Sequence, residues 1–500
     1  MRDYPAQYEV RPLGPGGFDA TGANAVRVPG SKSMTNRALP LAALAEGATT
    51  LTGVLFADDT RRMIEALGTL GFELKIDEDA AAVTVRGGGG GGGGDGGTIP
   101  NAGESGRDVE LLLGNAGTAM RFLTAACTLG EPGSSYRLDG IPRMRKRPIG
   151  ELVDLLRELG ARIDYLGEEG FPPLRVHGGL PDAQATAEIP IGATLSSQYV
   201  SALLLIAPRL RDGLTIRVAG KLTSFPYVRM TVGMMNDFGA NVSLDDPDSN
   251  GVPQRMVARH ARQARYGRNG AEYRIEPDAS NASYFLAAAA VNGRSSVEVR
   301  DLSVDGAQGD AGFAGTLEAL GAEVDRPTSG SHPWIRVTSP RGSHASGSLC
   351  LRGQTCDLAD MPDMAQTLAV VALFADGPTT IRNVGNLRVK ETDRLAALEN
   401  ELTKLGATVT IDGDDITITP PTDDTALPFT PGEAVAIDTY DDHRMAMSFA
   451  VAGLASDRLP GRPRVVINDP GCVAKTYPGF WDDLRRYLGA EVVKPEKASP

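Results

Sequence analysis

The sequence predicts an α/β protein made of two similar globules. Three observations carry this prediction: a short glycine motif that recurs six times, an amphipathic segment before each copy, and a nearly all-apolar segment in each repeat. At 500 residues the chain is also too long for one hydrophobic core. We therefore expect six βαβ-type repeats of about 80 residues, three in each globule.

The recurring motif is a hydrophobic residue, glycine, usually alanine, any residue, and then an aliphatic residue. Successive glycines lie 89, 79, 82, 85 and 83 residues apart, at Gly71, Gly160, Gly239, Gly321, Gly406 and Gly489. Each copy ends an amphipathic segment, such as 151–158, and precedes a run rich in β-branched residues. Glycine in this place is typical of a residue that ends a helix in the left-handed conformation before a strand.

A second helix with almost no polar face is expected in each repeat. Such a helix is stable only when it is buried among sheets and amphipathic helices. The six segments are Ser33 to Ala45, Asn115 to Leu129, Ser196 to Ala207, Ser280 to Val291, Pro362 to Phe374 and Asp441 to Ala455. A strand from Tyr8 to Leu13 can join the second globule by a circular exchange, which the pattern alone does not establish.

The composition is that of an ordinary globular protein, with 41% hydrophobic and 23% charged residues. A net charge of -13 argues against nucleic acid or a membrane surface as a partner. The four cysteines lack CxxC spacing and the five histidines form no HExxH motif, so we expect buried thiols and no metal. No leader-like segment or apolar run of ~18 residues is visible, which predicts a cytoplasmic protein.

The glycine tract at 87–97 interrupts the first repeat. A phosphate-binding loop is one interpretation, but no GK[ST] sequence follows the tract and no helix is expected to begin there. We therefore expect a flexible insertion.

The start of the first apolar helix, in the stretch 29–37, is the first candidate anion site. Lys32 and Arg37 stand among serine and threonine hydroxyls there, after a Pro-Gly turn. A helix N-terminus carries unpaired N–H groups and partial positive charge, so it attracts anions. These residues predict a site for a phosphate or a carboxylate.

Other helix starts in the first half have similar chemistry. In 114–121 the glycines allow a ligand close approach, and Asn115 and Thr118 suit helix caps. Ser196-Ser197-Gln198 precedes the next apolar helix, where a plain helix cap is an equally good interpretation. The basic run 143–147 is either a solvated face or an anion site, because Pro148 as first helical residue would place Arg147 before a helix N-terminus.

In the second half, Lys390 and Arg394 lie four residues apart on one helix face, with two carboxylates between them. A surface ion-pair ladder is the simple interpretation. The alternative is that Glu391 is an acid or base held among cations that bind anionic reactants. Asp363, at the start of a buried helix, is either a helix cap or a second functional carboxylate.

Arg444 and Lys475 add cations at the starts of later segments. Every repeat but the fourth therefore places a cation, an amide or a hydroxyl at the same structural position. We expect these positions to meet in a cleft between the globules, to bind two small and highly anionic molecules, and to exclude water when the globules close.

Seven motifs, in order along the chain, resemble the 5-enolpyruvylshikimate-3-phosphate (EPSP) synthase family. They are PGSKSxxNRAL, GNAGTAMR, RPI, SSQ, NxRVKETDR, DDHRMAM and DPGCVAKTYP, which together extend from about Pro29 to Phe480. The resemblance implies two domains, each of three βαβαββ repeats arranged as an inside-out α/β barrel, with the active site in the cleft between them. We assign 29–276 to the first domain, mainly on the shikimate 3-phosphate side, and 1–28 with 277–500 to the second.

The resemblance also implies the reaction. The carboxyvinyl group of phosphoenolpyruvate would pass to the 5-hydroxyl of shikimate 3-phosphate by addition and elimination, releasing phosphate without a metal or a cofactor. This is a step of the shikimate pathway to chorismate and the aromatic amino acids. We expect a monomer with these two small-molecule partners, and neither nucleic acid nor a membrane.

The resemblance also implies roles for individual residues, each carried over from the family's motifs to the matching position in this sequence. Asp363 would accept the 5-hydroxyl proton, Glu391 would protonate the methylene carbon, and Lys32 would reach both substrates. The residues implied for shikimate 3-phosphate are Lys32, Ser33, Arg37, Ser196, Ser197, Gln198, Ser224, Tyr227, Asp363, Asn386 and Lys390. Those implied for phosphoenolpyruvate are Lys32, Asn115, Gly117, Arg147, Gln198, Glu391, Arg394, Arg444 and Lys475.

Two other functions compete with this assignment. The sister enolpyruvyl transferase that acts on UDP-N-acetylglucosamine lacks Lys-Ser at the position of Lys32 and has a reactive loop cysteine, whereas 144–148 contains no cysteine. A catalytically silent anion-binding relative would not need to keep Lys32, Asp363 and Glu391. One departure from the family pattern is Phe122, where many members have proline, and it is expected to reshape its helix.

Overall fold

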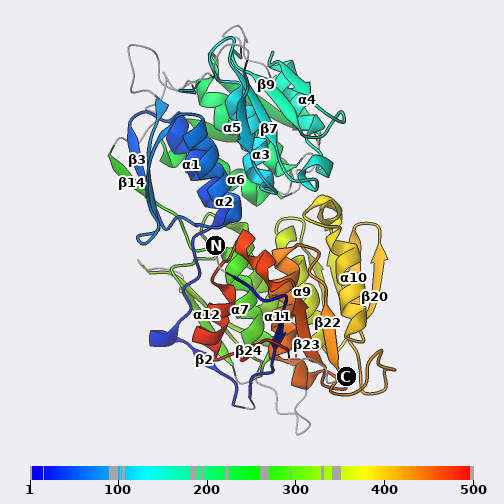
Figure 1. The fold of residues 1–500 in the computed structure, drawn as a ribbon. Coiled ribbons are helices and arrows are strands. Elements are labelled where there is room, and N and C mark those ends of the chain that lie inside the picture. The colour runs from blue at the N-terminus through cyan, green and yellow to red at the C-terminus, as the bar shows by residue number, and fades with distance from the viewer. Residues whose placement is uncertain are drawn as a thin grey trace. The chain divides into compact units, whose positions relative to one another are not determined.

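The computed structural model describes residues 3–14, 16–88, 99–101, 103, 107–180, 188–192, 196–219, 224–249, 251–259, 270–293, 295–327, 332–340 and 351–495. The chain divides into two compact units. Unit 1 comprises Met1–Pro29 and Pro277–Pro500, and unit 2 comprises Gly30–Glu276. Figure 1 shows that each unit combines helices and small sheets.

The described part of unit 2 contains three four-stranded sheets with one shared topology. Their strand orders are β14 (Ala271–Arg274), β3 (Ala48–Thr52), β5 (Ala82–Arg86), β4 (Glu73–Asp77); β6 (Val109–Leu112), β7 (Ser135–Asp139), β9 (Leu174–His177), β8 (Ile163–Tyr165); and β10 (Glu188–Gly192), β11 (Leu214–Ala219), β13 (Pro253–Ala258), β12 (Val242–Pro247). In each sheet the first two strands are parallel and the other neighbours are antiparallel.

Unit 1 repeats this topology three times within its described residues. The strand orders are β2 (Asp19–Ala20), β15 (Ser296–Arg300), β17 (Trp334–Thr338), β16 (Glu323–Asp325); β18 (Thr355–Asp357), β19 (Thr379–Arg382), β21 (Asp415–Thr419), β20 (Thr408–Asp412); and β22 (Ala434–Ile437), β23 (Arg464–Asn468), β1 (Gln7–Val10), β24 (Val492–Val493). The N-terminal strands β1 and β2 thus complete two sheets whose other strands come from 296–493.

The apolar segments form the inner helices of both units, as predicted. They are α1 (Lys32–Leu44), α3 (Gly117–Cys127) and α5 (Ser197–Ile206) in unit 2, and α7 (Ala279–Val291), α9 (Ala365–Val371) and α11 (His443–Leu454) in unit 1. The 3-10 turns η7 (Pro362–Met364) and η8 (Ala372–Phe374) extend α9 at its two ends. Within each unit the three inner helices pack against one another.

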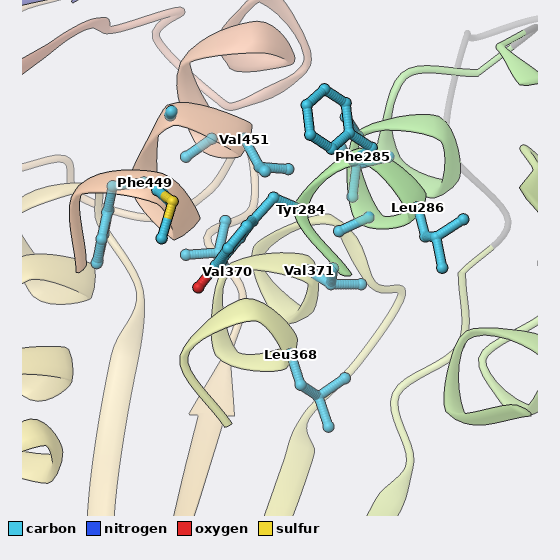
Figure 2. Close-up of a cluster of buried hydrophobic side chains, with 14 of the residues drawn as sticks. Tyr284, Phe285, Leu286, Leu368, Val370, Val371, Phe449 and Val451 are labelled. Carbon is cyan, nitrogen blue, oxygen red and sulfur yellow. The ribbon is translucent and has the colours of Figure 1, made fainter. Parts of the chain in front are cut away.

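Buried side chains from α7, α9 and α11 form the core of unit 1 (Figure 2). Tyr284 of α7 lies beside Val370 of α9 (Figure 2), and Tyr284, Phe285, Val370 and Phe449 of α11 are each fully excluded from solvent. Burial of side chains of this size contributes about 1.5–3 kcal/mol each, which explains why these helices need no polar face.

The outer helices end at the motif glycines, as predicted. They are α2 (Asp58–Thr69), α4 (Gly150–Glu158), α6 (Phe225–Asp237), α8 (Phe313–Ala319), α10 (Arg394–Lys404) and α12 (Phe480–Leu488). The six glycines have φ of +87°, +94°, +84°, +108°, +90° and +66° in chain order. After α4, for example, the Gly160 N–H donates to Arg157 O and the Ala161 N–H donates to Leu156 O, both at 2.9 Å. These two bonds satisfy carbonyls at the end of the helix before the chain enters a strand.

Short 3-10 helices connect the larger elements. They are η1 (Gly22–Asn24), η3 (Met144–Lys146), η4 (Ala207–Arg209), η6 (Gly309–Gly312), η9 (Gly385–Val389), η10 (Ser456–Arg458) and η11 (Pro470–Lys475). The expected insertion at 87–97 lies, apart from Gly87 and Gly88, outside the described residues. Among the helices that the structure describes, none combines the length and the apolar character of a membrane span.

Candidate active site

Helix α1 begins at the first candidate anion site of unit 2. The Ser31 hydroxyl caps the helix by accepting the Met34 N–H at 3.3 Å. Lys32 Nζ lies 3.8 Å from Asp59 Oδ2, with side-chain exposures of 15% and 7%. The predicted cation is therefore held beside a carboxylate of α2 that the sequence pattern did not indicate. Ser33 is half-buried, and its carbonyl accepts a bond from Arg37.

Arg37 is almost wholly buried, one turn further along α1. Its Nε donates to Thr231 Oγ1 at 2.8 Å and its Nη2 to Ser201 Oγ at 3.4 Å. The guanidinium also lies 5.4 Å from the ring centroid of Phe122 and 6.0 Å from that of Tyr227. Burial lowers the pKa of Arg37 to about 10. Because these partners are neutral, an anion bound nearby would offset the cost of the buried charge.

Gly117, Asn115 and Arg147 meet at the start of α3. Arg147 Nη1 donates to Asn115 O at 3.2 Å and to Asn115 Oδ1 at 3.4 Å, and the Arg147 side chain is buried. A Cβ on Gly117 would stand only 2.6 Å from Arg147 Nη2. A larger residue at this position would therefore displace the Arg147 guanidinium.

Two expectations about these helix starts are wrong. The N-cap of α3 is Ala116, without a side-chain bond, so Asn115 and Thr118 do not cap the helix, and Asn115 binds Arg147 instead. Helix α4 begins at Gly150 rather than at Pro148. The Ile149 and Gly150 N–H groups both donate to Gly170 O, at 2.9 and 3.1 Å, which holds the chain outside helical geometry up to that point.

The remaining candidates of unit 2 lie at the starts of α5 and α6. Ser196 is the N-cap of α5 and accepts the Gln198 N–H at 3.3 Å, whereas Ser197 is buried and Gln198 half-buried. Ser224 precedes α6 with a left-handed φ of +57°, and the half-buried Tyr227 follows within its first turn. A left-handed serine is uncommon and costs about 1–3 kcal/mol, so it marks a constrained position.

Unit 1 gathers its candidates around Arg394, the first residue of α10. The Nε atom lies 2.7 Å from Asp442 Oδ2, Nη1 lies 3.2 Å from Asp363 Oδ1, and Nη2 lies 2.9 Å from Glu391 Oε2. The Arg394 side chain is only 2% exposed, so a surface ion-pair ladder is the wrong interpretation. Asp393 caps α10 by accepting the Ala396 N–H.

Asp363 is held by three cations. Its Oδ2 accepts from Arg444 Nη2 at 2.7 Å, and its Oδ1 lies 3.9 Å from Lys390 Nζ in addition to its contact with Arg394. It is not a helix cap, because α9 begins at Ala365 and its N-cap forms no side-chain bond. The turn η9, which carries the half-buried Asn386, packs against η7, which carries Asp363.

Glu391 lies between two cations. Its Oε1 is 3.2 Å from Lys475 Nζ and its Oε2 is 2.9 Å from Arg394 Nη2. Burial would lower the pKa of Arg394, but the charges of Asp442, Glu391 and Asp363 raise it above its usual value. The guanidinium therefore stays charged at any physiological pH, and the carboxylates of Asp363 and Glu391 are held in place by their contacts with it.

Four residues that contact the predicted site residues were not themselves predicted from the sequence: Asp59, Asp442, Ser280 and Asp310. Asp59 lies beside Lys32, and Asp442 binds Arg394 and also accepts the Arg444 N–H at 2.9 Å. In the fourth repeat, which supplies none of the predicted site residues, Ser280 lies on α7 with its Oγ 3.4 Å from Arg444 Nη2 and donates to Asp310. Asp442 could have been found from its place in the DDHR motif. Asp59, Ser280 and Asp310 could not, because their partners are distant in sequence.

The chemistry of the two units differs. Unit 2 offers cations, hydroxyls and amides at the starts of α1, α3, α5 and α6, which is a chemistry for binding anions. Unit 1 offers two partly exposed carboxylates among four cations, which can bind anions and also move protons.

Comparison with known proteins agrees with this chemistry. The family model described as EPSP synthase (3-phosphoshikimate 1-carboxyvinyltransferase) matches residues 21–484. The 3-phosphoshikimate 1-carboxyvinyltransferase of Thiobacillus denitrificans is 45% identical over 94% of this chain and 97% of its own length. The chloroplastic enzyme of the same name from Nicotiana tabacum is 44% identical over 92% of this chain and 82% of its own length.

Solved structures share the fold. A structure of EPSP synthase from Acinetobacter baumannii superposes with a TM-score of 0.72 over 98% of this chain and 100% of that one, at 24% identity. The enolpyruvyl transferase NikO from Streptomyces tendae gives a TM-score of 0.66 at 19% identity, over 98% of this chain and 99% of its own.

Proposed function

Because the chain belongs to the EPSP synthase family, we infer that it is a 3-phosphoshikimate 1-carboxyvinyltransferase. It transfers the carboxyvinyl group of phosphoenolpyruvate to the 5-hydroxyl of shikimate 3-phosphate and releases phosphate, in the shikimate pathway to aromatic amino acids. The observation that carries this conclusion at the level of residues is the cluster in which Asp363 and Glu391 share the buried guanidinium of Arg394. The reaction needs one group to take a proton and another to give one, beside cations that bind the substrates.

The proposed proton transfers follow from this cluster. Asp363 accepts the proton of the 5-hydroxyl as its oxygen attacks the enol carbon, and Glu391 protonates the methylene carbon to give a tetrahedral intermediate. Loss of a proton from the new methyl group and departure of phosphate then restore the double bond. In this proposal Lys32 lies near both substrates, and Asp363 and Glu391 carry out the proton transfers.

The proposed binding roles divide by substrate. Shikimate 3-phosphate contacts Lys32, Ser33, Arg37, Ser196, Ser197, Gln198, Ser224, Tyr227, Asp363, Asn386 and Lys390, and phosphoenolpyruvate contacts Lys32, Asn115, Gly117, Arg147, Gln198, Glu391, Arg394, Arg444 and Lys475. Charged, hydrogen-bonded donors of this number suit two ligands that each carry a phosphate and a carboxylate. Donors fixed before the reaction also stabilise the charge that moves when phosphate leaves.

The test is phosphate release from the purified full-length chain. We expect release only when shikimate 3-phosphate and phosphoenolpyruvate are both present, and none with either alone. A reaction with UDP-N-acetylglucosamine in place of shikimate 3-phosphate would contradict the assignment, and no release with any acceptor would favour a silent anion-binding relative. Formation of the enol ether product, followed by mass spectrometry, separates transfer from simple hydrolysis of phosphoenolpyruvate.

We also propose that the protein is a cytoplasmic monomer that binds neither nucleic acid nor membranes. Its net charge of -13 supports the lack of nucleic-acid and membrane partners. Cys127 and Cys472 are buried free thiols, which is consistent with a reducing compartment. Light scattering of the purified protein and fractionation of the source cells test these two proposals.

A further inference from the structure

We propose that Asp310 is a positioning residue for the reaction, which acts through the Ser280 hydroxyl on the guanidinium of Arg444. This inference rests on the proposed function, because it takes Arg444 to be a ligand of phosphoenolpyruvate. Asp310 and Ser280 belong to the fourth repeat, the one repeat that supplies none of the predicted site residues.

The turn η6 is fastened to the start of α7. Gln308 Nε2 donates to Pro277 O at 2.7 Å, and the Ala279 N–H donates to Gln308 Oε1 at 3.0 Å. Asp310, two residues later, accepts the Ser280 hydroxyl proton. Gln308 and Asp310 are each 5% exposed. Two buried side chains of one short turn therefore fix the backbone and the hydroxyl at the beginning of α7.

The direction of the Ser280 bond determines what Ser280 offers to Arg444. A serine hydroxyl has one proton and two lone pairs. Because a carboxylate can only accept, Ser280 gives its proton to Asp310 and turns its lone pairs toward Arg444 Nη2, which is 3.4 Å away. The same Nη2 donates to Asp363 Oδ2 at 2.7 Å. The guanidinium is thus held between Ser280 and Asp363, which sets the direction of its other N–H groups.

The charges around Asp310 make this arrangement sensitive to pH. Asp310 faces Ser280 and Asp278 at the start of α7, Asp363 on η7 and Arg444 on α11. Burial, followed by the charge of Asp363, raises the pKa of Asp310 to about 6. Above that pH Asp310 accepts from Ser280. Below it the protonated carboxyl can donate to Ser280 instead, so the hydroxyl proton is free to turn toward Arg444, where it opposes the guanidinium.

Four variants test the proposal through steady-state kinetics. Ser280→Ala removes the hydroxyl, and Asp310→Ala removes its acceptor. Each should raise the KM for phosphoenolpyruvate about tenfold, as expected for loss of a hydrogen bond to a charged group, while kcat and the KM for shikimate 3-phosphate change less than about threefold. Asp310→Asn keeps an acceptor oxygen, and Ser280→Thr keeps the hydroxyl, so both should stay within about threefold of the wild type.

The control is Glu298→Gln, which alters another buried carboxylate of unit 1, paired with Arg300 and Arg336 on the sheet of β15. It should leave the KM for both substrates unchanged. Circular dichroism of every variant shows whether it is folded. If Ser280→Ala and Asp310→Ala lower kcat and raise both KM values alike, or change nothing, the proposal is wrong. An inactive wild type would instead contradict the proposed function.

The pH profile provides a second readout. The wild type should lose affinity for phosphoenolpyruvate below about pH 6 more steeply than Asp310→Asn, which cannot become protonated there. The comparison in identical buffers cancels the ionisation of the substrate itself. Identical profiles for the two proteins would show that the Asp310 proton does not influence Arg444, and they would overturn the proposal.

Discussion

Arg394 is the residue on which the carboxylates of unit 1 converge. One buried guanidinium contacts Asp363, Glu391 and Asp442, and each of these also has a separate bond to another group. A rigid planar fork suits this task, because its donors point in fixed directions. The two proposed proton-transfer residues therefore keep their separation through a shared partner rather than through direct contact.

Glu391→Gln tests the role of this residue as an acid. Glutamine keeps the size and one acceptor oxygen near Lys475 and Arg394 but cannot supply the proton. We expect the dissociation constants of both substrates to change less than about tenfold and kcat to fall by about two to four orders of magnitude. Calorimetry measures binding and phosphate release measures turnover. If binding collapses together with kcat, Glu391 is a structural residue.

At the residue scale, a contact can be predicted from the sequence only when the two residues are close together along the chain. Lys390, Glu391 and Arg394 could be found because they are close together in one short charged stretch. The predicted shared helix face is wrong, since α10 begins only at Arg394 and Lys390 is the C-cap residue of η9. Asp59 and Asp310 could not be found, because they reach Lys32 and Ser280 from elements 27 and 30 residues away, through packing that no local pattern encodes. The environment of Arg37 was equally hidden, since its partners come from α5 and α6.

The six glycines after the outer helices determine where each helix ends and the next strand begins. Left-handed φ is costly for any residue with a Cβ, so glycine at this point stops the helix and directs the chain into the next strand. The local pattern was sufficient to predict this feature because it involves only six consecutive residues. The starts of α3 and α4 were mispredicted because their geometry depends on Arg147 and on Gly170, which lie far along the chain.

One glycine within α8 and one just after its end provide a matched test. Gly321 ends the helix with φ of +108°, whereas Gly315 lies within it, and an added Cβ there would meet nothing within 4 Å. Gly321→Ala should reduce the free energy of unfolding by about 1–2 kcal/mol. Gly315→Ala should increase it by about 0.5–1 kcal/mol, because alanine favours a helix. Scanning calorimetry measures both shifts, and a lower melting temperature for both variants would contradict the prediction.

At the scale of the whole molecule, the buried charge of Asp310 lowers the free energy of unfolding at neutral pH. Its folded pKa of about 6 lies above the unfolded value of 3.8, so the folded state favours the protonated form. Below about pH 4 both states are protonated and there is no cost. Between pH 4 and 6 the unfolded state ionises first, so the cost of burying the charge grows and is complete above pH 6.

Asp310→Asn should therefore be more stable than the wild type at pH 7.5, by on the order of 1–3 kcal/mol, and equally stable at pH 4. Thermal melts at the two pH values measure the difference. A variant that is less stable at pH 7.5 would show that the carboxylate is a structural anchor. Gains in stability on removal of a charge are expected where function, rather than folding, keeps the charge in place.

The predicted class of the molecule, an α/β chain of repeated units, is confirmed because repeated helix ends and apolar helices are local signals summed over six copies. The division into 29–276 and the remaining chain was an assignment by resemblance. The repeat pattern alone could not predict this division, because two sheets of unit 1 are completed by N-terminal strands and one sheet of unit 2 is completed by its last strand.

The position of β1 has a consequence for synthesis on the ribosome. Gln7 faces Asn468 in one sheet, and the two residues are 461 apart in sequence. At about 5–20 residues per second, β1 therefore leaves the exit tunnel roughly 20–90 s before its partner strand exists. All strands of the unit 2 sheets are made within that interval. We expect unit 2 to fold first on the nascent chain, while an unpaired strand edge near the N-terminus is a target for chaperones until translation ends.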